Sequence, residues 1–194
     1  SSPAGISVAK DAKLTIDSEP EQQGSIEVLN NTSVSRTGAA IGGNGEQDAG
    51  IIHIKGGTVS ATSASKGAAI GASVGKSVEE IRISGGNVTA KSSGGAGIGT
   101  GSVNREERTG KIVIEGGTVN ASSWSGAGIG SGYGYVPGSS AIIAKIEIHG
   151  GMITAYSKWG ACIGSGKYSS SKVLIDGGTI CLDKKTTEYG EVAH

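Results

Sequence analysis

Apolar residues along this chain occur in short runs in which they alternate with polar residues. The run "IIHIKGG" at 51–57 is representative, and the run is followed by a second alternating piece, "TVSA" at 58–61. Four later runs end in the same two glycines: "IRISGG" (81–86), "IVIEGG" (112–117), "IEIHGG" (146–151) and "VLIDGG" (173–178). Alternation at period two, rich in Ile and Val, predicts β-strands with one buried face. No segment keeps a 3.6-residue apolar stripe, so we expect essentially no helix.

A second landmark recurs between these runs, with the form Gly-Ala-x-Ile-Gly. It occurs five times, at 38–42, 67–71, 95–99, 126–130 and 160–164. The repeat length is variable and about thirty residues, a period typical of solenoid proteins. Each unit therefore consists of a strand, a Gly-Gly corner, a second strand, a polar turn, the Gly-Ala-x-Ile-Gly strand and a loop.

Strands this short cannot bury a face alone, so successive units must stack and share one core. The sequence predicts an all-β fold, a single right-handed parallel β-helix with roughly six coils. Alternation places Ile52, Ile54 and Ile70 inside, and predicts that the middle residue of the Gly-Ala-x-Ile-Gly strand, such as Ala69 or Cys162, faces outward. A leucine-rich repeat, a propeller and a β-sandwich fit worse, because the chain lacks a leucine ladder, a blade-length period and a reason for one repeated corner.

The repeat landmarks divide the chain into three parts. Residues 1–37 lack the Gly-Gly corner and are predicted to form the N-terminal opening coil of the solenoid. Residues 38–182 hold the parallel β-helix repeats, and the polar segment 183–194 is predicted to be a C-terminal cap or tail.

The amino-acid composition limits the classes of partner that this chain is expected to bind. Glycine contributes 36 of 194 residues, which fits a chain with many turns, and the 17 basic and 17 acidic residues balance. A neutral chain offers no field that would gather nucleic acid or an anionic membrane surface. No apolar run approaches the length of a membrane helix, so we expect neither nucleic-acid binding nor membrane insertion. Cys162 and Cys181 are predicted to be free thiols on different faces, with a disulfide as the alternative.

The order of "AKLTI" (12–16), "GSIEV" (24–28) and the alternating landmarks resembles the repetitive β-helix segments of large bacterial cell-surface proteins. It is similar, less closely, to the carbohydrate-binding β-helix family related to polysaccharide lyases. This resemblance covers roughly residues 6–182 and implies a bacterial module, secreted or on the cell surface, that adheres or binds glycan as part of a larger surface protein. That family has acidic residues suited to calcium near the corners; Ala, Gly or Cys stands there in this chain, so we expect no metal and no cofactor.

Aromatic residues cluster late in the chain. Apart from Tyr189 they fall between 124 and 168, and they are the candidate ligand-binding residues: Trp124, Tyr133, Tyr135, Tyr156, Trp159 and Tyr168. The two tryptophans precede the same corner on adjacent coils, and two of the tyrosines lie on the longest insertion, 131–145. Aromatic faces stack on sugar rings, which predicts a patch for a polysaccharide or a host or cell-wall glycan. The alternative is that these rings fill the underside of the long loop.

One outward column carries possible acid-base chemistry. Stacking would bring Glu115, His149 and Asp176 together on three successive coils, with the two carboxylates roughly 9.5 Å apart. That distance approaches the upper limit for an inverting glycosidase, but a solvated face with weak ion pairs explains the column more simply. The remaining Asp and His residues are scattered, so the chain is not expected to be an enzyme. A purely structural stalk or adhesin spacer and a degenerate polysaccharide lyase remain as alternatives.

Overall fold

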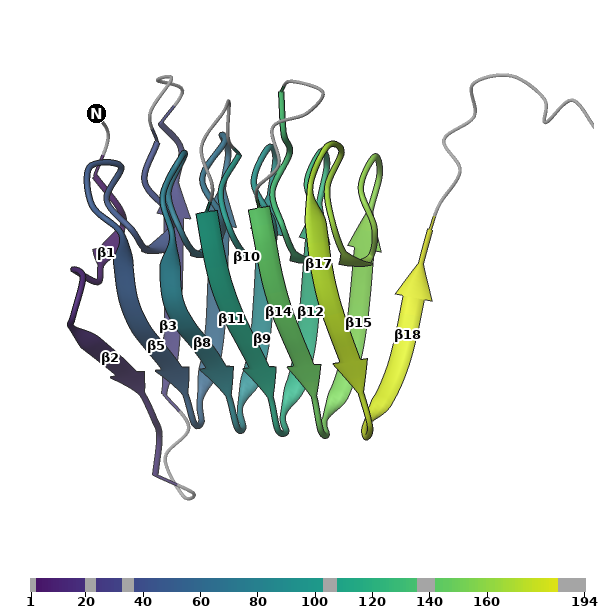
Figure 1. Cartoon of the computed structure of the whole chain (residues 1–194). Coiled ribbons are helices and arrows are strands. Elements are labelled where there is room, and N and C mark those ends of the chain that lie inside the picture. Colours follow the sequence, from purple (N-terminus) through teal and green to yellow (C-terminus); the bar gives the residue numbers. More distant parts are fainter. Residues whose placement is uncertain (1–2, 20–23, 33–36, 103–107, 136–141, 185–194) are drawn as a thin grey trace, which may run out of the picture.

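The predicted parallel β-helix is confirmed by the computed structural model, which describes residues 3–19, 24–32, 37–102, 108–135 and 142–184. Eighteen strands form three parallel sheets of six strands each, and the described residues contain no helix. Each coil contributes one strand to every sheet, so the chain winds around one core in an arrangement consistent with a right-handed β-helix (Figure 1). No helix long and apolar enough to cross a membrane occurs in these ranges.

The three sheets correspond to the three strands of each repeat. Sheet 1 is narrow and contains β1 (Ile6–Ser7), β4 (Ile41–Gly42), β7 (Ile70–Gly71), β10 (Ile98–Gly99), β13 (Ile129–Gly130) and β16 (Ile163–Gly164). Sheet 2 contains β2 (Lys13–Ile16), β5 (Ala49–Ile54), β8 (Val78–Ile83), β11 (Arg108–Ile114), β14 (Ile142–Ile148) and β17 (Ser170–Ile175). Sheet 3 contains β3 (Ser25–Asn30), β6 (Thr58–Ser63), β9 (Asn87–Ser92), β12 (Thr118–Ser123), β15 (Met152–Ser157) and β18 (Thr179–Asp183).

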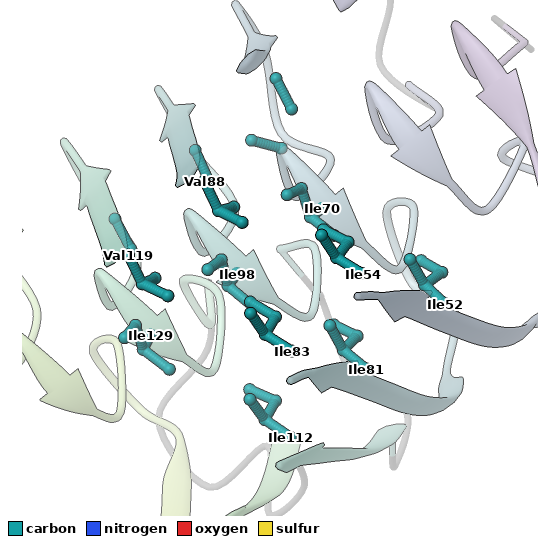
Figure 2. Close-up of a cluster of buried hydrophobic side chains, with 14 of the residues drawn as sticks. Ile52, Ile54, Ile70, Ile81, Ile83, Val88, Ile98, Ile112, Val119 and Ile129 are labelled. Atoms are coloured by element: carbon teal, nitrogen blue, oxygen red, sulfur yellow. The ribbon is translucent and has the colours of Figure 1, made fainter. Parts of the chain in front are cut away.

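Equivalent apolar residues stack in columns along the axis of the solenoid. One column at the end of sheet 2 consists of isoleucine in every coil: Ile16, Ile54, Ile83, Ile114, Ile148 and Ile175. Its four central members are fully buried. Figure 2 shows members of this column beside isoleucines of sheet 1 and valines of sheet 3. The core is therefore a continuous stack of branched side chains that no single coil could bury by itself.

The Gly-Gly corners connect sheet 2 to sheet 3. In each corner the second glycine has a positive φ, between 79° at Gly57 and 94° at Gly151, a region that residues with a Cβ rarely adopt. The corners form the lower edge of the molecule in Figure 1, and the loops around sheet 1 form the upper edge.

The prediction that the middle of the Gly-Ala-x-Ile-Gly strand faces outward is wrong. Ala69 is fully buried and Cys162 is 7% exposed, and both belong to the hydrophobic core. The motif is a tight turn around a two-residue strand: the Ala68 N–H donates to the Ala72 carbonyl oxygen across it at 3.0 Å. Since the chain reverses here instead of running on extended, alternation between the two faces does not apply.

The last described coil leaves apolar side chains exposed. Val173, Ile175 and Leu182 are 46%, 46% and 56% exposed, although they continue columns that are buried in the preceding coils. Their inner faces lose contact because no described residues form a coil beyond β16, β17 and β18. The two cysteines are free thiols, as predicted, with Cys162 buried and Cys181 exposed.

Candidate functional site

Trp124 and Trp159 lie in the turns that lead from sheet 3 into sheet 1 on adjacent coils. The backbone N–H of Trp159 donates to the carbonyl oxygen of Trp124 at 3.1 Å, so the two residues lie on neighbouring rungs but one residue out of register: Lys158 is opposite Trp124, and Trp159 is opposite Ser125. Trp124 is 55% exposed and Trp159 is 62% exposed, which is unusual for the two largest apolar side chains of a chain. The structure thus presents two indoles side by side to solvent.

Buried serines fix the two turns that carry these indoles. Ser123, at the end of β12, donates its hydroxyl to the Gly95 carbonyl oxygen at 2.7 Å and accepts the Gly126 N–H at 2.9 Å. Ser157 repeats the pattern one coil later: its hydroxyl donates to the Gly126 carbonyl oxygen and accepts the Gly160 N–H. Each serine ties its own turn to the preceding coil. The buried polar groups of the two turns are thereby hydrogen-bonded. These bonds hold in place the backbone that bears the tryptophans.

Lys158 lies close to both indoles. Its Nζ atom lies 3.4 Å from the ring centroid of Trp124 and 5.4 Å from that of Trp159. Both distances are within the range in which an ammonium group is attracted by the negative face of an indole. The tryptophan pair is therefore a mixed aromatic and cationic surface.

A second aromatic group lies on the other side of sheet 1. The rings of Tyr133 and Tyr135 meet edge to face, with centroids 5.0 Å apart, and the Nζ atom of Lys66 lies 4.8 Å from the Tyr135 centroid. On the next coil Lys167 Nζ lies 4.8 Å from the ring of Tyr168, and the Gly134 N–H donates to the Lys167 carbonyl oxygen. The tyrosines and Lys167 thus lie on the loops that leave sheet 1, and Lys66 reaches them from the turn that enters β7.

The two groups belong to one edge of the solenoid because sheet 1 is so narrow. The Ala127 N–H donates to the Ser131 carbonyl oxygen at 2.9 Å, which draws together the turn that enters β13 and the loop that leaves it. We call this edge, made of Trp124, Tyr133, Tyr135, Trp159 and Tyr168, the aromatic edge. It belongs to the upper edge of Figure 1, on the side opposite the Gly-Gly corners.

Tyr156 is the one sequence-predicted residue that lies apart. It is on β15, in register with Ser122 and Asp183, and it faces outward from sheet 3 with partial burial. Among the described residues it makes no ring contact with another aromatic side chain. Of the predicted 131–145 insertion, residues 136–141 lie outside the described ranges.

Sequence reasoning missed the three lysines. Lys158 and Lys167 directly precede Trp159 and Tyr168, so their adjacency was a readable signal. The sequence gives no such indication for Lys66, because Lys66 and its partner Tyr135 are far apart in the chain and lie on coils that are two rungs apart.

The acid-base column is also observed, as a row of exposed polar contacts. His149 Nδ1 lies 2.7 Å from Asp176 Oδ1, whereas Glu115 is paired with Arg82 instead of His149. A groove of about 530 Å³ does exist, but it lies at the start of sheet 2, where Asp48, Lys111 and Lys145 contribute to its walls. None of the residues of the column and none of the aromatic edge line it. Among the described residues no group of three His, Cys, Asp or Glu side chains is placed to hold a metal ion.

Ion pairs on the outer face of sheet 2 connect neighbouring coils. Glu80 Oε1 accepts a hydrogen bond from Arg82 at 2.9 Å, and Glu80 Oε2 lies 3.1 Å from Lys111 Nζ on the next coil. Partial burial acts to raise the pKa of the Glu80 carboxyl, but hydrogen bonds from Arg82 and Lys111 outweigh it and hold this pKa below its usual value of 4.5.

This lowered pKa makes part of the stability depend on pH. A carboxyl group whose pKa is lower in the folded state stabilises the fold above its unfolded pKa, and that contribution is lost as the pH falls through the folded pKa. We expect Glu80→Gln to reduce the free energy of unfolding by about 0.5–1 kcal/mol at pH 7 and by less at about pH 3. Urea unfolding at both pH values measures this, with the exposed neighbour Glu79→Gln as control. A loss that persists undiminished at the lower pH would contradict the assignment.

Comparison with known proteins agrees with this architecture. Four segments, 52–74, 81–102, 112–133 and 146–167, match the family model described as "Beta helix repeat". Each segment starts within a strand of sheet 2 and runs past the Gly-Ala-x-Ile-Gly turn. The fold and these repeats define a parallel β-helix repeat protein. No curated protein and no solved structure gave a significant match.

Proposed function

We propose that this chain is a non-catalytic surface module that binds a polysaccharide or another glycan through its aromatic edge. The observation that carries the proposal is the pair of indoles, Trp124 and Trp159, held over adjacent coils and more than half exposed. Indole faces combine a large apolar area with a rigid shape, which suits them to stack on sugar rings at a small loss of conformational entropy.

The competing explanation, that the aromatics only fill space beneath a long loop, accounts for part of the cluster. Tyr133 is partly buried against Tyr135 and fits that role. It does not account for the tryptophans, because a side chain that fills the underside of a loop loses most of its exposure. Exposed aromatic patches of this kind are typical of binding surfaces.

The absence of a catalytic role is part of the same proposal. Within the described ranges the acidic column pairs with basic partners on an open face, and the groove on sheet 2 lies elsewhere. A surface location fits a glycan ligand, so we further propose that the chain is secreted or displayed on a bacterial cell surface, as one segment of a larger protein that contacts host or cell-wall glycan.

The test is a glycan array followed by titration calorimetry on the best ligand. We expect the Trp124→Ala, Trp159→Ala double variant to bind at least about thirtyfold more weakly, since each stacked ring contributes about 1 kcal/mol or more. A matched control removes two other exposed apolar side chains, Leu29→Ala and Met152→Ala, which are 55% and 60% exposed on sheet 3. This control should bind as the unaltered chain does, and thermal unfolding should show that both variants fold.

Two results would overturn the proposal. A chain that binds no glycan on the array favours the structural stalk or adhesin spacer, and equal loss in both double variants means that the indoles are not special. Release of unsaturated sugars from a uronate polymer, abolished by a chelator, would instead favour the degenerate polysaccharide lyase.

A further inference from the structure

Three rings of the aromatic edge each have the ammonium group of a lysine over their face. The pairs are Lys158 with Trp124 at 3.4 Å, Lys66 with Tyr135 at 4.8 Å and Lys167 with Tyr168 at 4.8 Å, measured from Nζ to the ring centroid. The lysines come from three different turns and loops. A repeated pairing of this kind ties the cations to the aromatic surface, so the two features belong to one site.

These three ammonium groups have no described carboxylate within 4 Å. In the part of the chain that the structure describes, none of them forms an ion pair with a carboxylate. The lysines of sheet 2 differ, since Lys111 and Lys145 lie 3.1 Å from Glu80 and 2.8 Å from Glu147. The chain as a whole has equal numbers of acidic and basic residues. The three lysines of the aromatic edge thus have no carboxylate partner among the described residues, whereas Lys111 and Lys145 on the outer face of sheet 2 do.

The cations are also spread along the axis of the solenoid. Lys66 precedes β7, and Lys158 precedes β16, which lies three rungs further on in the same sheet. At the spacing of parallel strands, three rungs correspond to about 14 Å. This is the separation of the backbone positions, because Lys66 Nζ itself reaches the ring of Tyr135 on the coil of β13. A linear polymer that runs along the edge would reach all three lysines.

Lys158 discriminates against a neutral sugar. Its ammonium group lies over the face of Trp124, and a pyranose ring that stacks on this face must displace it. A neutral sugar gives the displaced ammonium no charged partner in exchange for the lost cation–π contact. A sugar with a carboxylate or sulfate group gives the displaced ammonium group a charged partner. The indole of Trp124 then stacks on the same sugar unit whose acidic group Lys158 binds.

We propose that the ligand of the aromatic edge is an acidic glycan, a linear polymer whose sugars carry carboxylate or sulfate groups. This inference rests on the proposed function, because it assumes that the edge binds glycan. It adds the charge of the ligand, its direction along the solenoid and the residues that select it: Lys66, Lys158 and Lys167.

The experiment compares charged and uncharged forms of the same polymer on the whole chain. Oligogalacturonate and its fully methyl-esterified form have the same sugar backbone, and a sulfated galactan and its desulfated form extend the comparison to sulfate. We expect the acidic polymers to bind at least about tenfold more tightly than the neutral ones, and this preference to fall at about 0.5 M salt.

Two triple variants with equal charge change separate the site from general electrostatics. The edge variant is Lys66→Gln, Lys158→Gln and Lys167→Gln; the control variant is Lys13→Gln, Lys91→Gln and Lys172→Gln, which are exposed lysines of sheets 2 and 3. We expect the edge variant to lose about tenfold or more in affinity for the acidic polymer, and the control less than about threefold.

Each contrary outcome has its own meaning. If the methyl-esterified polymer binds as tightly as the charged one, the inference is wrong while glycan binding stands. If both triple variants lose affinity equally, the lysines act only through net charge and the inference is again wrong. If none of these polymers and no glycan on the array binds, the proposed function fails as well.

Discussion

Gly99→Ala is expected to lower the free energy of unfolding by about 3–6 kcal/mol, a large fraction of the stability of a typical domain. Gly99 is the final residue of the Gly-Ala-x-Ile-Gly turn and has a φ of +136°. A methyl group at this position would overlap the carbonyl oxygen of Gly130 in the next coil and would also approach the Cδ1 atom of Ile112 to 3.2 Å. The fixed rung spacing leaves the backbone no room to move away.

The same motif provides a matched control. Gly164 occupies the equivalent position in the last coil with a φ of +131°, but the nearest atom to an added Cβ there is the Cβ of Ala161, at 3.4 Å. Gly164→Ala therefore carries the backbone strain without the clash, and we expect a loss of about 1–3 kcal/mol. Thermal and urea unfolding followed by circular dichroism measure both variants. Equal losses would show that φ alone, and not the contact with the next rung, requires glycine.

Ile114→Ala is expected to cost about 3–4 kcal/mol, the second largest effect. Ile114 is fully buried in the isoleucine column of sheet 2, between Ile83 and Ile148. Truncation removes three carbon atoms from the centre of a close-packed stack, and the rungs on either side hold the resulting cavity open.

Ile175 tests whether the stack, and not the residue type, produces this effect. It is the last isoleucine of the same column, but 46% of its surface is exposed. Ile175→Ala should therefore cost about 1 kcal/mol or less, because little apolar area leaves contact. A comparable loss at both positions, measured by urea unfolding, would contradict the view that stability comes from contacts between adjacent rungs.

Much of the fold was readable from the sequence. The period-two runs of Ile and Val set the strands, and their return with Gly-Gly corners required stacking, because no unit has enough apolar surface for a core of its own. Trp124 and Trp159 precede equivalent turns, so their place on adjacent coils also followed from the repeat. Alternation failed at Ala69 and Cys162, since the Gly-Ala-x-Ile-Gly strand is too short to remain extended on both sides.

The sequence by itself determined the columns, the corners and the neighbourhood of the two indoles, because all of these repeat with the coil. Only the tertiary structure decided which side chains of different coils meet where the contact does not recur from repeat to repeat. Examples are Lys66 over the ring of Tyr135, and Glu115 with Arg82. Long side chains cross several rungs and choose partners by charge and reach. These contacts depend on the three-dimensional course of the loops, which a local pattern of apolar and polar residues does not encode.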